Sequence, residues 1–241
     1  MGYVDLHCHL LWELDDGCIS AEESLAVARA LVARGYTDVA PSPHVQARYG
    51  GGDERWARER LDEARELLRS AGVPLALHPG AENVLDEDYL ERAAAGETRG
   101  MGECGRYVLL EVPFLDLVPH LENLVREVTR TGVIPVLAHP ERCVEFVRPG
   151  RAEELAREGA LFQLNLGALI GRHGRHAQAA AEHFLDRGLY SVVGTDLHGP
   201  EEAEEWIGEA LASLAERAGS AAVRMLCDEH PHRMLAGQPL S

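Results

Sequence analysis

The segment Asp5-Leu6-His7-Cys8-His9 ends an apolar stretch that begins at Tyr3, near the start of the chain. Residues two apart on a β-strand face the same way, so we expect His7 and His9 on one side of a strand and Cys8 on the other. Two imidazoles at one strand end are suited to binding a metal ion, but a lone His-x-His pair is a weak signal. Whether the pair indicates a metal site therefore depends on which residues stand at the ends of the other strands.

Apolar runs alternate regularly with amphipathic stretches along the whole chain. The predicted strands are Tyr3–His9, Asp38–Ser42, Leu75–Glu82, Tyr107–Val112, Ile134–His139, Leu161–Asn165 and Ser191–Asp196. The predicted helices are Ser20–Arg34, Asp53–Ala71, Asp86–Ala95, Pro119–Thr131, Ala152–Glu158, Ala177–Arg187 and Glu201–Ala218. Regular βα alternation is typical of a parallel sheet, and seven units in 241 residues favour a closed or nearly closed barrel over a doubly wound open sheet. We therefore predict an α/β fold in a single domain, residues 1–241.

Polar side chains stand at the C-terminal end of nearly every predicted strand. Besides His7 and His9, they are His44, Glu82, Glu111, His139, Asn165, Asp196 and His198, and the loop after the first strand adds Asp15 and Asp16. Each of them alone could be a polar cap on a strand. The C-terminal ends of barrel strands meet at one face, where barrel enzymes carry their active sites. Ligand-type residues at six strand ends therefore predict a metal site on that face.

The motifs DLHCH, SPH, GAE, LLEVP, LAHPER and TDLH follow one another in this order. Together with Asp15-Asp16-Gly17 and the segment QLNLGALIGR at 163–172, they resemble the PHP (polymerase and histidinol phosphatase) superfamily. Within it, the whole chain is similar to the bacterial capsule-associated protein-tyrosine phosphatases. The resemblance implies a distorted (β/α)7 barrel, the PHP fold, and three divalent metal ions, with manganese expected and iron, zinc or magnesium as alternatives. The ligands that it implies are His7, His9, Asp16, His44, Glu82, Glu111, His139, Asp196 and His198.

Those nine positions supply five imidazoles, four carboxylates and no thiolate, a set that suits Mn, Fe, Zn or Mg better than a soft metal. Metal ions about 3.5–4 Å apart can activate water and hold phosphate oxygens. We therefore expect a phosphatase that cleaves phosphomonoesters by in-line attack of a metal-bound hydroxide. The resemblance implies phosphotyrosine on protein as the first candidate substrate. Arg142 is expected to bind a phosphoryl oxygen, and a surface salt bridge with Glu141 or Glu145 is the alternative.

The chain departs from the capsule-associated phosphatases after His198. Members of that group usually carry an arginine there, and the stretch Gly199 to Trp206 has none. Candidate substitutes for this phosphate-binding residue are Arg172, Arg175 and Arg48. His173 and His176 are candidate proton donors to the leaving group, and the glycines at 50–52 are a candidate lid beside His44.

Other functions remain open at this point. One is a small-molecule phosphoesterase of the histidinol-phosphate type or an amidohydrolase, although no lysine stands on a predicted strand for the carboxylated lysine that amidohydrolases often use. Another is a non-catalytic binding protein on the same fold. A cysteine-dependent tyrosine phosphatase is excluded, because Leu14 stands where such an enzyme needs an arginine after Cys8.

Composition narrows the partners and the compartment. The net charge of −17 argues against nucleic acid, which needs clustered basic residues. No apolar stretch or basic N-terminal region suggests a membrane span or a signal peptide. Five cysteines without a CxxC pair are typical of free thiols, and hence of the cytoplasm. The expected partner is a phosphotyrosine protein, such as the tail of a tyrosine kinase, or a small phosphomonoester; nothing in the sequence indicates the oligomeric state.

Overall fold

The structure, a computed structural model, describes residues 2–45, 54–201 and 203–240. Arg48 and the glycines at 50–52, the candidate substitute arginine and the candidate lid, lie outside the described residues.

Short strands form two parallel sheets. The first sheet consists of β1 (Tyr3–Asp5), β2 (Tyr36–Val39) and β3 (Ala76–Leu77), in that order. The second consists of β4 (Glu82–Val84), β5 (Tyr107–Glu111), β6 (Ile134–Ala138), β7 (Leu161–Asn165) and β8 (Val192–Gly194), also in chain order. Every pairing between neighbouring strands is parallel. The chain therefore has the mixed α/β architecture with parallel sheets that the alternating pattern predicts.

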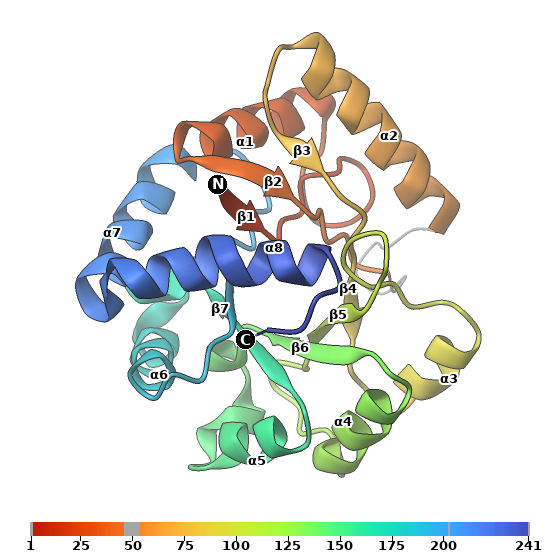
Figure 1. The fold of residues 1–241 in the computed structure, drawn as a ribbon, viewed down its shortest axis with the longest axis vertical. Coiled ribbons are helices and arrows are strands. Elements are labelled where there is room, and N and C mark those ends of the chain that lie inside the picture. Colours follow the sequence, from red (N-terminus) through yellow and green to blue (C-terminus); the bar gives the residue numbers. More distant parts are fainter. Residues whose placement is uncertain (1, 46–53, 202, 241) are drawn as a thin grey trace.

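Helices connect most successive strands and lie around the outside of them (Figure 1). They are α1 (Ala21–Ala33), α2 (Glu54–Ser70), α3 (Tyr89–Ala94), α4 (Leu121–Arg130), α5 (Arg151–Arg157), α6 (Gly174–Asp186), α7 (Ala203–Arg224) and α8 (His230–Leu235). Short 3-10 turns η2 (Pro140–Arg142), η3 (Val144–Val147) and η4 (Leu166–Ile170) follow β6 and β7, and the π-helical turn η5 (Met225–Glu229) precedes α8. The predicted helix Glu201–Ala218 ends where α7 is kinked, at Gly219, whose φ is +82°. Beyond this kink the chain continues as a helix that was not predicted, across the side where both termini lie.

The single strand predicted over Leu75–Glu82 is wrong. The chain instead forms β3 and β4, which belong to different sheets. Pro79 has no N–H to donate to a neighbouring strand. At Gly80 the backbone passes so close to the end of β2 that a Cβ there would lie 2.7 Å from the Pro41 carbonyl oxygen. These two residues interrupt the strand where the chain passes from one sheet to the other.

Isolated bridges connect the two sheets. Cys8 pairs with Leu197, and His44 pairs with Glu82, both in parallel orientation. Beside the first bridge, the backbone N–H of His9 donates to the Leu197 carbonyl over 2.8 Å. These contacts hold the ends of β1 and β8 together, and they hold the segment after β2 against β4.

A small apolar cluster packs the facing sides of both sheets. It includes Val4 of β1, the residues Leu6 and Ala40 that follow β1 and β2, and Leu109, Val136, Ala138 and Val192 from the second sheet. Met234 of α8 belongs to the same cluster, at the side of the fold that α8 crosses. Because side chains alternate along a strand, the row through Leu109 of β5 continues to Glu111. In the same sheet, β8 ends at Gly194 and Asp196 follows two residues later. The apolar rows therefore end in polar groups at the C-terminal ends of the strands.

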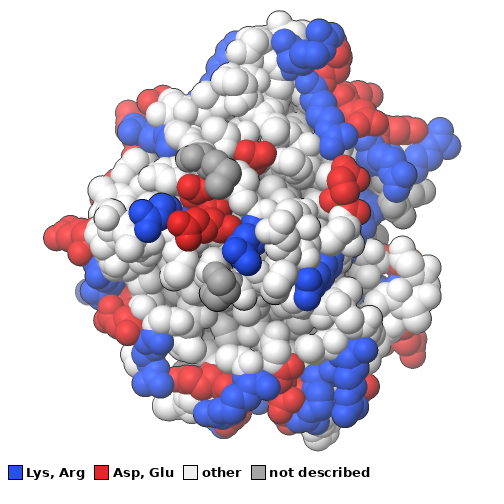
Figure 2. All heavy atoms as spheres, in the orientation of Figure 1, with Lys and Arg blue, Asp and Glu red and all other residues white. Residues whose placement is uncertain are grey.

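The face that α8 crosses carries basic and acidic side chains that are interspersed around its rim (Figure 2). Among the described residues, no helix is both long enough and apolar enough to cross a membrane.

Candidate metal centre

The strand ends bring eight of the nine predicted ligands together in three groups. Within each group the potential ligand atoms lie within 4.8 Å of one another. The groups are His9, Asp16, His44 and His198; His7, Glu82 and His139; and His7, His9 and Asp196. His7 and His9 belong to two groups each, so the three groups form one continuous cluster, which we call the ligand cluster.

His7 and His9 point to the same side of the chain, as their spacing predicts, and Cys8 is buried on the other side. The Nε2 atoms of His7 and His9 are 3.3 Å apart. The opposite ring nitrogens are held by hydrogen bonds, His7 Nδ1 to Gln163 Oε1 over 2.9 Å and His9 Nδ1 to Asp15 Oδ2 over 2.7 Å. Both Nε2 atoms are therefore turned toward the centre of the ligand cluster.

Two buried carboxylates face this imidazole pair. Glu82 Oε2 lies 3.2 Å from His7 Nε2 and 3.4 Å from His9 Nε2. Asp196 Oδ1 lies 3.2 Å and 3.5 Å from the same two atoms. Each carboxylate is thus placed to share a cation with both imidazoles.

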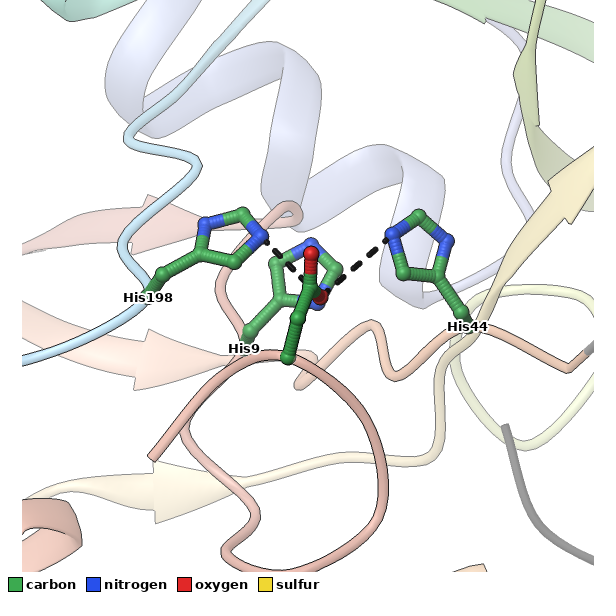
Figure 3. A group of neighbouring side chains, drawn as sticks. His9, His44 and His198 are labelled. Atoms are coloured by element: carbon green, nitrogen blue, oxygen red, sulfur yellow. Dashed lines mark ion pairs between the residues drawn. The ribbon is translucent and has the colours of Figure 1, made fainter. Parts of the chain in front are cut away.

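The outer part of the ligand cluster contains His9, His44 and His198, whose rings face a common centre (Figure 3). Asp16 Oδ1 lies 3.4 Å from His198 Nε2 and 3.7 Å from His44 Nε2. The Asp16 side chain is 60% exposed, so this group opens toward solvent.

The inner part contains His139 and Glu111. His139 Nε2 lies 3.2 Å from Glu82 Oε1. The backbone of His139 (φ +32°) and that of Asp196 (φ +56°) are left-handed, a conformation that costs energy in residues other than glycine and often marks functional sites. Glu111 is the one predicted ligand outside the three groups, although it is buried at the end of β5 and is close enough to Glu82 to be affected by its charge.

The protonation of the ligand cluster follows from burial and from the mixture of charges. Burial lowers the pKa of His7, but the charges of Glu82 and Asp196 outweigh burial and raise it to about 9. Burial, with the nearby charge of Glu82, raises the pKa of Glu111 to about 8. Buried atoms Oε2 of Glu111 and Nδ1 of His139 have no hydrogen-bond partner among the described residues. Buried polar atoms without partners are costly, and divalent cations would satisfy an arrangement of this kind.

Asp15, Gln163 and Asn165 orient the ligands, a role that the sequence did not predict for them. Asp15 accepts hydrogen bonds from His9 and from the backbone N–H groups of Gly17 and His44. Gln163 holds His7, and Asn165 Nδ2 donates to Asp196 Oδ2 over 2.8 Å. The signal for Gln163 was its position two residues before Asn165 on the same strand face.

Arg142 follows β6 and lies beside the ligand cluster. Its Nη1 donates to Asp196 Oδ2 over 2.7 Å, and its guanidinium carbon lies 4.4 Å from the centre of the Phe114 ring. The alternative salt bridge with Glu141 or Glu145 is wrong. Glu145 pairs with Arg151, and Glu141 accepts hydrogen bonds from the Tyr190 hydroxyl and the Asn165 N–H.

A cavity of 360 Å³ adjoins the solvent side of the ligand cluster. Its walls include Asp16, Asp196 and His198 from the cluster, and Arg172, His173 and Trp206 from the segments beside it. Arg175 and His176 are not among the described residues that line it. Desolvation and the neighbouring charge of Arg142 lower the pKa of His173 to about 4.

The protein is therefore an α/β protein with parallel sheets. Imidazoles and carboxylates at the ends of its strands form a candidate site for divalent metal ions. The chain belongs to the family described as "Capsular polysaccharide synthesis, CpsB/CapC", which matches residues 3–236.

Relatives in this family are similar to the chain over nearly its full length. The tyrosine-protein phosphatase YwqE of Bacillus subtilis is 29% identical over 226 residues, which cover 93% of this chain and 89% of YwqE. The tyrosine-protein phosphatase CpsB of Streptococcus pneumoniae is 24% identical over 241 residues, which cover 98% of this chain and 99% of CpsB.

Solved structures also match. One, from a study of YwqE and of CpsB from Streptococcus pneumoniae as "unique metal-dependent tyrosine phosphatases", has a TM-score of 0.91 and 28% identity and covers 99% of this chain and 96% of that chain. An inactive dihydroorotase-like domain from Chaetomium thermophilum has a TM-score of 0.56 at 12% identity, covers 99% of this chain and 79% of that chain, and shares the fold alone.

The adjacent Asp15 and Asp16 differ in a way that unfolding can measure. Asp15 accepts three hydrogen bonds, and an amide in place of its carboxylate would turn an NH2 group toward at least one of those donors. We expect Asp15→Asn to lower the free energy of unfolding of the metal-free protein by about 1–3 kcal/mol. Asp16→Asn, at an exposed position, should change it by less than about 0.5 kcal/mol. Urea unfolding of both variants measures the difference; equal losses would contradict the distinct roles of the two residues.

Proposed function

We propose that this chain is a metal-dependent protein-tyrosine phosphatase that acts in capsular polysaccharide synthesis. The observation that carries the proposal is the ligand cluster, in which His7 and His9 share Glu82 and Asp196, in a chain that matches tyrosine-protein phosphatases over nearly its full length. The geometry accounts for the metal requirement, and the relatives supply the substrate class, phosphotyrosine in protein.

The nine proposed metal ligands are His7, His9, Asp16, His44, Glu82, Glu111, His139, Asp196 and His198. The three groups of the ligand cluster support three divalent ions, and manganese is our first choice because the donors are nitrogen and oxygen without thiolate. When bound, such ions lower the pKa of water and neutralise charge on phosphoryl oxygens. Asp15 and Gln163 keep the imidazole Nε2 atoms directed inward, so the site is organised before substrate arrives.

Arg142 is the proposed catalytic residue that binds the phosphoryl group. Contact with Phe114 and the single hydrogen bond to Asp196 fix the guanidinium plane while leaving other N–H donors for phosphate oxygens. His173 is a poor proton donor to the leaving tyrosine oxygen at neutral pH, because a pKa of about 4 keeps its imidazole neutral.

We also propose that the two sheets are parts of one distorted (β/α)7 barrel, in which β3 and β4 together take the place of one strand. The isolated bridges at Cys8 and His44 support closure between the two sheets, and the apolar cluster that contacts both sheets supports a shared interior. Residues 1–241 would then form one domain.

The finer substrate proposal is a phosphotyrosine in the tail of a tyrosine kinase. The proposed compartment is the cytoplasm, because all five cysteines are free and a reducing environment preserves free thiols.

Phosphatase assays test this function directly. With added Mn²⁺, the protein should hydrolyse p-nitrophenyl phosphate and a phosphotyrosine peptide. Either His198→Ala or the double replacement of His7 and His9 by Ala should lower kcat by at least about 100-fold, because ligand imidazoles are lost.

The matched control is His183→Ala, which removes an exposed imidazole on α6 and should leave kcat unchanged. Activity that survives loss of both His7 and His9 would contradict the metal mechanism. Turnover of histidinol phosphate without turnover of the peptide would contradict the substrate.

Metal affinity should depend strongly on pH. At pH 7 the metal-free protein keeps protons on His7, with a pKa of about 9, and on Glu111, with a pKa of about 8, and these protons must leave before both residues can bind a cation. As the pH rises from about 6 to about 8, the Kd for Mn²⁺ should therefore fall, by up to about tenfold per pH unit for each proton released.

Calorimetry in buffers of different ionisation enthalpy counts the protons released. Glu111→Gln should reduce the number by about one at pH 7, because it removes one of the groups that hold a proton in the metal-free protein. A Kd for Mn²⁺ that is independent of pH, without proton release, would contradict these protonation states.

A further inference from the structure

Arg172 lies in the cavity beside the ligand cluster, two residues after the 3-10 turn η4. Among the described residues, no carboxylate forms an ion pair with it, although Asp16, Asp196 and Glu201 line the same cavity. By contrast, Arg142 pairs with Asp196, and Arg151 pairs with Glu145. An unpaired guanidinium beside a proposed metal site is placed to meet an anion from solution.

Packing of the segment after β7 fixes the position of Arg172. Its guanidinium carbon lies 4.8 Å from the centre of the Trp206 ring, and its backbone N–H donates to the Gly167 carbonyl over 3.1 Å. Gly167 leaves room for this side chain, because a Cβ at that position would lie 3.2 Å from Arg172 Cδ.

Asn165 connects this packing to the ligand cluster. Its Oδ1 accepts a hydrogen bond from the Gly167 N–H over 3.0 Å, while its Nδ2 donates to Asp196. One side chain therefore positions both a proposed metal ligand and the turn that carries Arg172.

Stacking on an aromatic ring leaves the N–H edge of a guanidinium available to bind an anion. The Arg172 side chain is exposed in the cavity, and none of its side-chain N–H groups forms a hydrogen bond among the described residues. The cavity also contains Asp16, Asp196 and His198, so a phosphoryl group that reaches these proposed ligands enters the space that Arg172 lines.

We propose that Arg172 is a substrate-binding residue that donates hydrogen bonds to the phosphoryl group of the substrate, as a second guanidinium in addition to Arg142. The proposal deepens the proposed function and rests on it. Two guanidinium groups together with metal ions match the three non-bridging oxygens of a phosphomonoester, whereas a diester has only two such oxygens. Arg172 would thereby favour monoesters such as phosphotyrosine.

The test compares Arg172→Ala and Arg172→Lys with Arg175→Ala in Mn²⁺-loaded protein. Arg175 is a matched control, since it is exposed three residues further along and does not line the cavity. Calorimetric titration with inorganic phosphate measures binding of the phosphoryl group without turnover. Steady-state kinetics with p-nitrophenyl phosphate and with phosphotyrosine peptides, with and without acidic flanking residues, then measure KM and kcat.

For Arg172→Ala we expect phosphate to bind about tenfold more weakly, and KM to rise for p-nitrophenyl phosphate and for both peptides. Arg172→Lys should recover only part of the loss, because an ammonium lacks the planar fork. Arg175→Ala should match the wild type.

Unchanged phosphate affinity in Arg172→Ala would overturn the proposal, and so would a loss confined to the acidic peptide, which would place Arg172 on a flanking carboxylate. Failure of the proposed function is distinguishable from both. In that case the wild type binds phosphate but does not hydrolyse the phosphotyrosine peptides.

Discussion

The close approach of His7 and His9 is the constraint on which the rest of the site depends. Two imidazole nitrogens 3.3 Å apart, both buried, cannot be satisfied by each other unless one carries a proton. The carboxylates of Glu82 and Asp196 lie close to the same two nitrogens and stabilise a proton on the imidazole pair. For this reason the pKa of His7 rises to about 9. The same carboxylates and imidazoles form a site for divalent cations once those protons leave.

The fold produces this crowding in a simple way. Leu109 of β5 and Val192 of β8 belong to the apolar cluster, Glu111 is the last residue of β5, and Asp196 lies two residues beyond the end of β8. The C-terminal ends of parallel strands lie at one side of the fold. The polar residues at the ends of different strands therefore lie close to one another there. The bridge between Cys8 and Leu197 then brings the imidazoles that follow β1 against the aspartate that follows β8. The left-handed backbone conformation of Asp196 costs free energy. Hydrogen bonds from Arg142 and Asn165 to its side chain offset this cost and fix the residue.

Spacing and strand order predicted much of this arrangement. The two-residue period placed His7 and His9 together, and the shared edge of parallel strands placed His139 and Asp196 near them. Sequence spacing did not reveal the break at Pro79 and Gly80, because the close approach of Gly80 to Pro41 is a tertiary contact. The sequence also does not distinguish the role of Asp15 from that of Asp16. Two adjacent aspartates in a loop differ only in the direction in which the folded backbone points their side chains. The helix that ends the chain was missed for the same reason, because Met234 is held by the apolar cluster rather than by a local pattern.

Anomalous diffraction at the manganese edge, from crystals grown with Mn²⁺, tests the central claim most directly. Three peaks within the ligand cluster are the predicted result. A single ion, or ions bound away from His7 and His9, would contradict the account.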